Sequence, residues 1–502
     1  MKTRFYMLLA LVFIVLNIGS GSWGLTESSE ARYAEIGREM ALSGDYLHPN
    51  LLGIQHYHKP PVTYYITALG YKIFGYNEFA ARFFLSLALV LQIFLVFKIG
   101  LLLFKDEKTA FASALIYFTF PVVLIASRNL TTDAYLTTFI IMSTYFWLKR
   151  KGGGAVFWLY AFYAVLGIAF LTKGPVVWLP GIVFILCWKI IYKEKIRISI
   201  HTVLGTILLL AISASWFVAI IIDIPDLWNY FIEDQIIKRS VAAEKFHRAE
   251  PFWYYFVLAP LIGFPWLIFV VSGLIKKYKQ VIKPEPIPVI LTFTSGIILL
   301  LFSAFSSKLI MYILPMYCFV ALLAGYLLKY FSDKTLKIFL NTYTALYALL
   351  LAGLLVAGYF KGIHVDYRLA IPLAAAAVAS VFFLFRYLPL DRRYRLLYLG
   401  FSFSCSLILT YAIFGKNNPD TINSVKEITS FLKQKKPEMK EVMVYDYLLP
   451  SASFYLQKKI ITIENGNFNT HRETRFEEGE DFKKHLVDVR SAEGIRKFKA
   501  LL

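Results

Sequence analysis

The stretch FYMLLALVFIVLNIGSGSW (residues 5–23) is almost wholly apolar, whereas SSEARYAEIGREM (28–40), which follows closely, is rich in charged residues. An apolar run of this length can cross the hydrocarbon core of a bilayer, about 30 Å thick, as a helix. Runs of this kind recur along most of the chain. The pattern therefore predicts an all-α membrane protein whose first polar segment lies just beyond its first span.

The composition agrees with a membrane protein. Of the 502 residues, 58% are hydrophobic and 17% are charged, whereas a soluble chain would carry roughly 25% charged residues. The net charge of +20 invites a nucleic-acid partner, but the basic residues lie in short loops between apolar runs, where they set membrane orientation. Nucleic acid is therefore not expected as a partner. The three cysteines lie inside apolar runs and are expected to be buried hydrophobes.

We predict about thirteen transmembrane helices, which together form a multi-span bundle over residues 1–415. The candidate spans are residues 5–22, 80–104, 109–127, 131–149, 155–171, 175–192, 201–222, 254–275, 287–305, 309–330, 337–360, 370–388 and 396–414. No small-residue cleavage pattern stands out after the first span, and further spans follow it, so we expect a retained anchor rather than a signal peptide.

Short loops rich in Lys and Arg predict the orientation of the bundle. With the N-terminus in the cytoplasm, all of these basic loops fall on the cytoplasmic side, in agreement with the positive-inside rule. They comprise residues 105–108, 149–154, 192–197, 276–283, 329–337 and 386–395. The outer side then holds two longer loops, 23–79 and 223–253, together with the C-terminal tail.

The tail, residues 416–502, differs in composition from the bundle. The segment TINSVKEITSFLKQ (421–434) has helical periodicity, and EVMVYDY (441–447) and KKIITIE (458–464) have the pattern of short strands. We therefore expect a small extracytoplasmic α/β domain after the last span.

Ionisable side chains gather at the predicted outer face. Those in the two outer loops and at outer helix ends are Glu30, Arg32, His56, His58, Lys59, Arg128, Asp133, Lys173, Asp234, Arg239, His247, Arg248 and Lys308. A carboxylate at membrane depth is costly without a partner or a function, so Asp133 is either a functional residue or the salt-bridge partner of Arg128. Cations that converge with carboxylates suggest an anionic substrate such as a phosphate.

Two motifs in the first outer loop have a functional and a structural interpretation. SSEARYAEIGREM has the pattern of an amphipathic helix, which could begin at Ser28 or Ser29 and could simply lie in the membrane interface. In HYHKPP, two prolines stiffen the backbone beside Lys59. That lysine could hold a phosphate as a point charge, or it could only extend its charged end to the interface.

Five stretches resemble, in the same order, those of the lipid A aminoarabinose transferases. The stretches are EARYAEIGREMALSGDYLHPNLLGIQHYHKPPVTYY, TTDAYLTTF, LTKGP, KFHRAEPFWYYFVLAPLIGFPW and SKLIMYILP. That family comprises membrane glycosyltransferases of the C-type fold, which also includes the protein O-mannosyltransferases. The resemblance implies transfer of a sugar from a polyprenyl-phosphate carrier to a lipid, glycan or protein acceptor on the outer face of the bacterial cytoplasmic membrane, without a nucleotide cofactor.

The resemblance also implies roles for individual residues. The family often has Asp-Glu where this chain has Ser29-Glu30, so a general base for a hydroxyl acceptor would be Glu30 or Asp133, whereas a phosphate acceptor would need none. The donor phosphate would be held by Lys59, Arg32, Lys173, Arg248, Lys308 and Tyr312. Because His58 replaces the usual glutamate before the lysine, His58 and His247 are candidate ligands of a divalent metal, zinc or magnesium.

Two other classes of function compete with this interpretation. A transporter or flippase of a lipid-linked sugar would place its binding groups near the bilayer midplane, often on broken helices in repeated halves. Here the ionisable residues lie at outer helix ends and no repeat is evident. A non-catalytic scaffold would leave Asp133 and Lys59 unexplained.

Overall fold

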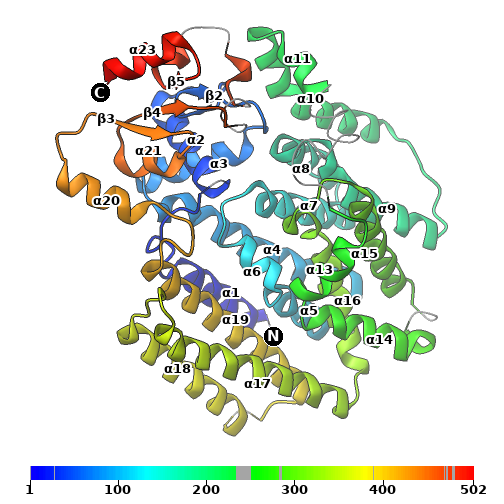
Figure 1. The fold of residues 1–502 in the computed structure, drawn as a ribbon. Helices are drawn as coiled ribbons and strands as arrows, with labels where there is room; N and C mark the ends of the chain where they lie inside the picture. Colours follow the sequence, from blue (N-terminus) through cyan, green and yellow to red (C-terminus); the bar gives the residue numbers. More distant parts are fainter. Residues whose placement is uncertain are drawn as a thin grey trace.

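The described part of the chain is mostly helical, and its strands form two small sheets (Figure 1). The computed structural model describes residues 2–27, 29–232, 250–281, 285–387, 389–467, 470, 473–477 and 481–501.

Long apolar helices form the membrane part. Within the described residues, six helices are long and apolar enough to cross a membrane. They are α4 (Glu78–Phe104), α10 (Ile200–Asp223), α15 (Pro286–Ala304), α17 (Asp333–Val356), α18 (Tyr367–Arg386) and α19 (Arg392–Asn417). Each coincides with a predicted span, so the prediction of a multi-span helical membrane protein is confirmed.

The other predicted spans are helices that are shorter, broken or, in the case of α7, not apolar enough, and the count of thirteen is not confirmed. They correspond to α1 (Lys2–Asn17), α5 (Glu107–Phe118), α6 (Pro121–Ala126), α7 (Thr132–Lys151), α8 (Phe157–Lys173), η1 (Pro175–Val177), α9 (Trp178–Ile191), α13 (Tyr254–Ile262), α14 (Trp266–Val281), η4 (Ile310–Ile313), α16 (Met316–Leu327) and η5 (Leu328–Tyr330). A further short helix, α11 (Leu227–Asn229), follows α10.

Two predicted spans are interrupted by proline. The span expected at 109–127 is divided between α5 and α6, because Phe120 is extended and Pro121 starts a new helix. The span expected at 254–275 is bent by 109° between α13 and α14. Pro265 lies in this break and has no N–H with which to continue the helical hydrogen bonding.

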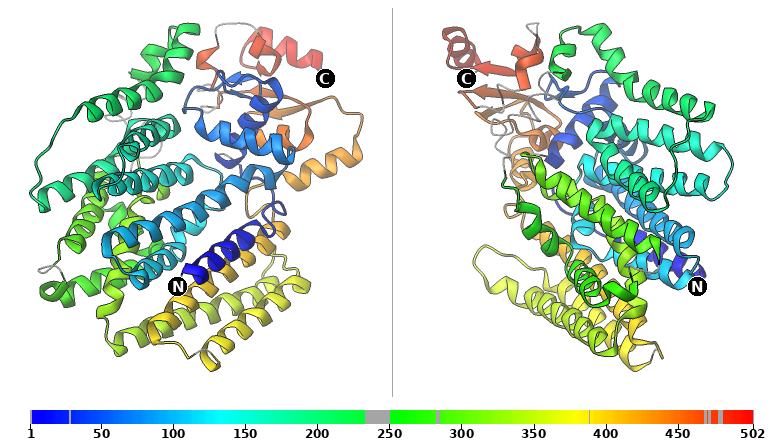
Figure 2. Two further views of the ribbon diagram at one scale, coloured as in Figure 1. Left: turned by 180° about the vertical axis from the view of Figure 1, so that it is seen from behind. Right: turned by 90° about the vertical axis from the view of Figure 1, so that its right-hand side faces the viewer.

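Small residues let the inner helices approach closely. A Cβ atom on Gly325 of α16 would lie 2.8 Å from the backbone nitrogen of Ser113 in α5. Small residues are enriched at such contacts in membranes, where packing rather than hydrophobic burial drives association. The α4, α5 and α16 helices share one core with α1 and α19, and α17, α18 and α19 lie side by side at one flank of the bundle (Figures 1 and 2).

The segment predicted to be the first outer loop, residues 23–79, is structured; it keeps that name here, while its side of the membrane stays a prediction. It contains α2 (Ser29–Ser43), the antiparallel pair β1 (Asn50–Leu51) and β2 (Ile54–Gln55), and α3 (Val62–Phe74). The amphipathic helix predicted from SSEARYAEIGREM is confirmed as α2, and its apolar face is buried at Ala31, Ala34, Ile36 and Met40.

The tail folds as α/β structure against this loop. Parallel strands β3 (Glu441–Tyr445), β4 (Lys459–Glu464) and β5 (Leu486–Asp488) form a sheet in the order β3-β4-β5. Around the sheet lie α20 (Lys426–Lys435), α21 (Pro450–Leu456), α23 (Ala492–Leu501), η7 (Thr474–Phe476) and η8 (Asp481–Lys484). Leu456 and Ile460 of the tail share a core with Ile36 and Leu51 of the first outer loop, so the two segments fold as neighbours (Figure 2).

Candidate active site

Asp133, Lys173 and Tyr312 come together from three elements. Asp133 lies in the first turn of α7, where the helix dipole favours a carboxylate. Lys173 is the last residue of α8, which ends because Gly174 takes a positive φ of 85°. The Lys173 Nζ atom donates a hydrogen bond to Asp133 Oδ1 and lies 4.1 Å from the centre of the Tyr312 ring. Three residues predicted separately therefore form one cluster.

A fourth residue, Tyr33 of α2, joins this cluster and was not predicted. Burial raises the pKa of its phenol to about 12, and the negative charge of Asp133 contributes to the increase. Tyr33 therefore stays protonated near neutral pH and can donate a hydrogen bond. Its position next to Arg32 in α2 links the cluster to a second group of predicted residues.

Arg128 is not the partner of Asp133. Its Nη1 atom donates to the Leu16 carbonyl oxygen at 2.7 Å, and its guanidinium lies 5.1 Å from the centre of the Trp23 ring. The structural alternative for Asp133, a salt bridge with Arg128, is therefore wrong. Lys173 takes that place instead.

Glu30 is held by Arg82 of α4. The Arg82 Nε and Nη2 atoms each donate to one Glu30 oxygen at 2.8 Å, and the Thr26 amide donates to Oε2 at 2.9 Å. The Glu30 residue is 1% exposed. This geometry favours a role for Glu30 in positioning the loop after α1. Asp133 is then the candidate base that contacts a predicted phosphate-binding cation, Lys173.

His58 belongs to a buried group of potential metal ligands. The His56 Nδ1 and His58 Nε2 atoms lie 2.6 Å and 3.2 Å from Glu473 Oε2, and one ligand atom of each residue lies within 4.8 Å of the others. His58 Nδ1 also hydrogen-bonds to the Tyr230 hydroxyl. The second predicted ligand, His247, lies outside the described residues.

Glu473 connects the tail with the first outer loop. Burial alone would raise the pKa of its carboxyl, but the charges and hydrogen bonds of His56 and His58 outweigh burial and hold the pKa well below its usual range. Its other oxygen, Oε1, lies 4.0 Å from Arg32 Nη1. One carboxylate from the tail thus contacts two residues predicted as site residues, His58 and Arg32.

Of the remaining predicted residues, the structure describes Lys59 and Lys308. Lys59 is half-buried next to His58, and α3 begins three residues later because Pro60 and Pro61 intervene. Lys308 is 3% exposed, and its Nζ atom donates to the Glu250 carbonyl oxygen at 2.6 Å. The predicted residues Asp234, Arg239 and Arg248 lie outside the described part of the chain.

Comparison with known proteins places this geometry in context. Residues 58–217 match the family described as dolichyl-phosphate-mannose-protein mannosyltransferase. An undecaprenyl phosphate-alpha-4-amino-4-deoxy-L-arabinose arabinosyl transferase of Pseudomonas fluorescens is 32% identical over 68% of this chain and 63% of its own length. A transferase of the same name from Proteus mirabilis is 28% identical over 84% of this chain and 81% of its own length.

Solved structures share the fold. The crystal structure of ArnT from Cupriavidus metallidurans bound to undecaprenyl phosphate superposes with a TM-score of 0.76, at 22% identity, over all of this chain and 91% of ArnT. The matched segment spans only about three fifths of several relatives, 58–63% of their length. The sequence of this chain resembles the lipid A aminoarabinose transferases over most of its length, as its motifs indicate, and its fold resembles theirs over the whole chain.

Proposed function

We propose that this chain is a membrane glycosyltransferase that moves a sugar from a polyprenyl-phosphate carrier to a lipid acceptor. The observation that carries the proposal is the cluster of Asp133, Lys173 and Tyr312 at the ends of three elements. The names of the similar transferases, which specify undecaprenyl phosphate and an aminoarabinose, favour an amino sugar as the group transferred. A glycan or a protein acceptor would use the same chemistry.

The reaction needs a base on one side of the sugar and cations on the other. An acceptor hydroxyl oxygen attacks the anomeric carbon while Asp133 takes the hydroxyl proton. The bond between the anomeric carbon and the carrier phosphate oxygen breaks, and the phosphate leaves with the electron pair. Lys59 and Arg32 would stabilise the charge that develops on that phosphate. Lys173 pairs with Asp133 and holds its carboxylate in place.

The direct test uses purified protein and a carrier lipid whose sugar is radiolabelled. A glycosyltransferase releases the carrier phosphate and moves the label to an acceptor lipid. Label that crosses the membrane of a proteoliposome still bound to its carrier would contradict this proposal and favour the transporter interpretation.

We expect Lys59→Ala to weaken use of the donor about ten- to a hundred-fold, because a charge-assisted contact contributes roughly 1.5–3 kcal/mol. The rate is measured against donor concentration. Lys72→Ala, which removes an exposed lysine from α3 in the same outer loop, is the matched control and should leave donor use unchanged. A folded Lys59→Ala protein with normal donor use would exclude Lys59 as a phosphate ligand.

We also propose that His56, His58 and Glu473 hold a divalent metal, with zinc preferred over magnesium. Two imidazoles and one carboxylate with converging, buried ligand atoms fit the ligand preferences of zinc. Bound there, the metal would add positive charge beside Lys59 and tie the tail to the first outer loop.

Metal analysis of the purified protein should find about one zinc ion per chain, and Glu473→Gln or His56→Ala should lower that content severalfold. His48→Ala is the control, because His48 lies in the same loop but pairs with Asp45 and Asp223. Equal zinc in the wild-type and Glu473→Gln proteins would rule out this site.

For the topology, we propose about thirteen crossings of the bacterial cytoplasmic membrane, with the site and the 416–502 domain facing outward. The Lys/Arg bias of the short loops supports this orientation. Single cysteines at Lys151 and Lys436, both exposed, should react with a membrane-impermeant thiol reagent from opposite sides. Labelling of both from one side would refute the orientation.

A further inference from the structure

A buried glutamine of α4 makes hydrogen bonds to two other helices. Gln92 is 3% exposed, and its Nε2 atom donates to the Ala134 carbonyl oxygen at 2.9 Å and to Thr138 Oγ1 at 2.8 Å, both in α7. Its Oε1 atom accepts the hydroxyl hydrogen of Tyr117 in α5 at 2.8 Å. Every polar atom of this side chain is therefore hydrogen-bonded.

The position of Gln92 makes these bonds strict. Helix α4 is one of the helices long and apolar enough to cross a membrane, and Gln92 lies near its middle. A polar side chain in such a place is costly unless its hydrogen-bonding groups have partners. If α7 rotated or slid along α4, a buried donor or acceptor would lose its partner. Gln92 therefore fixes α7 relative to α4 and α5.

The part of α7 that Gln92 holds is the turn that carries Asp133. Ala134 is the next residue, and the Thr138 hydroxyl, which accepts one of the bonds from Gln92, donates in turn to the Ala134 carbonyl oxygen at 3.0 Å. The Thr131 side chain at the start of α7 makes no capping hydrogen bond, so this turn lacks the usual local support. The bonds from α4 supply support from another helix.

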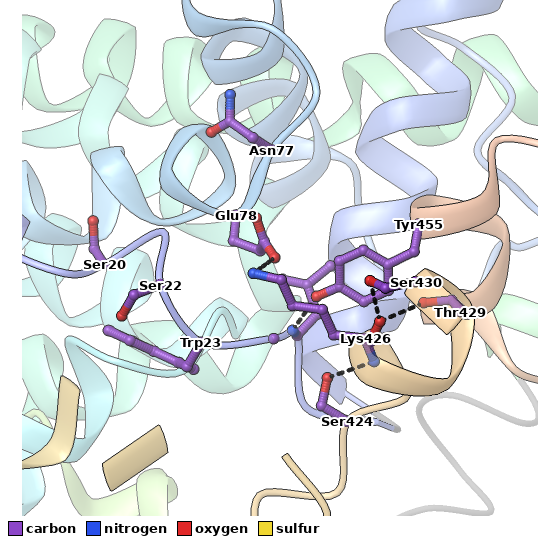
Figure 3. Close-up of polar contacts among 12 residues, drawn as sticks. Ser20, Ser22, Trp23, Asn77, Glu78, Ser424, Lys426, Thr429, Ser430 and Tyr455 are labelled. Atoms are coloured by element: carbon purple, nitrogen blue, oxygen red, sulfur yellow. Dashed lines mark hydrogen bonds and ion pairs between the residues drawn. The ribbon is translucent and has the colours of Figure 1, made fainter. Parts of the chain in front are cut away.

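Helix α4 is itself anchored at its N-terminal end. Asn77 caps the helix, and Glu78 pairs with Lys426 of α20 at 2.7 Å (Figure 3). About one turn further along, the Arg82 guanidinium donates to Glu30 and to carbonyl oxygens of the segment after α1. A helix held in this way is a fixed support against which the first turn of α7 can be placed.

From these contacts we propose that Gln92 is a positioning residue for sugar transfer, because it holds the first turn of α7 and thereby places the Asp133 carboxylate. Tyr117 and Thr138 belong to the same network and act in the same way. The inference rests on the proposed function, in which Asp133 is the base. A base must lie within hydrogen-bonding reach of the proton that it takes, and a displacement of about 1 Å can slow a reaction about a hundredfold.

The test compares Gln92→Met with the wild-type protein in the assay with radiolabelled donor. Methionine keeps the length of the side chain but lacks the amide that donates to α7. The maximal rate should fall about ten- to a hundred-fold. The donor concentration at half-maximal rate should change less than about twofold, because donor binding does not use Asp133. Thr138→Val should act in the same direction, whereas Thr138→Ser, which keeps the hydroxyl, should retain the rate.

A matched control separates positioning from stability. Tyr347 of α17 hydrogen-bonds to Ser406 Oγ of α19 at 2.6 Å, in a second buried network between helices. Tyr347→Phe should lower the unfolding temperature in detergent about as much as Thr138→Val does, and it should leave the maximal rate unchanged. An equal loss of rate in these two variants would mean that stability alone sets the rate, and it would overturn the proposal.

A double variant tests whether Gln92 acts through Asp133. Adding Gln92→Met to Asp133→Asn should lower the rate by less than about a further twofold, because residues that act as a unit have non-additive effects. A further loss of about tenfold would show an independent effect and contradict the proposal. If Asp133→Asn is slow and Gln92→Met is as fast as the wild type, the positioning role is wrong and the proposed function stands. A normal rate for Asp133→Asn would exclude the base and the positioning role together.

Discussion

Asp133→Asn is expected to slow sugar transfer to a hydroxyl acceptor by about 10²–10⁴-fold, the range typical for loss of a general base. Asparagine keeps the shape of the side chain and can still accept a hydrogen bond from Lys173, so the cluster should persist. What it lacks is the basic oxygen that takes the acceptor proton. Initial rates at saturating donor should fall, while the affinity for the carrier lipid stays near normal.

The matched control is Asp223→Asn. Asp223 ends α10, its side chain is 48% exposed, and its Oδ2 atom lies 3.3 Å from His48 Nε2. It is therefore a carboxylate with a side-chain partner of its own that is not part of the Asp133 cluster. It should retain a near-normal rate. If Asp133→Asn also retains a normal rate, no base operates at this position, and a phosphate acceptor, already ionised, becomes the better account.

The membrane part could be predicted from sequence because hydrophobic length is a local property. The six long helices arise directly from apolar runs. The breaks at Pro121 and Pro265 were missed, although proline is itself a local signal that a helix ends. The apolar residues continue on both sides of each proline. When hydrophobicity is averaged over a whole span, a single proline therefore does not divide it.

The site was predictable in part. Asp133, Lys173 and Tyr312 were selected as polar residues at outer helix ends, and they meet in space. Glu473 could not be found in this way, because it is separated by more than 400 residues from the histidines that it contacts. Arg82 did carry a signal, since an arginine just inside an apolar run requires a partner. Only the structure identifies that partner as Glu30.

The Arg82–Glu30 pair carries the second large effect. Glu30→Ala should lower the free energy of unfolding by about 3–5 kcal/mol, because it leaves the Arg82 guanidinium as a buried charge without a counterion. Arg82 also donates to the carbonyl oxygens of Ser20, Trp23 and Gly24. Removing its counterion therefore loosens the connection between α1 and the first outer loop. Chemical or thermal unfolding in detergent measures the loss.

Stability and rate together separate the two roles considered for Glu30. If the residue positions the loop, Glu30→Gln lowers the unfolding temperature, and the protein that remains folded transfers sugar at a near-normal rate. If Glu30 is the base, a fully folded Glu30→Gln protein loses its rate. Glu107→Gln is the control for stability, because Glu107 pairs with Lys2 at exposed positions, and pairs at the surface contribute only about 0.2–1 kcal/mol. The full burial of both Glu30 and Arg82, each 1% exposed, is the reason to expect the first result.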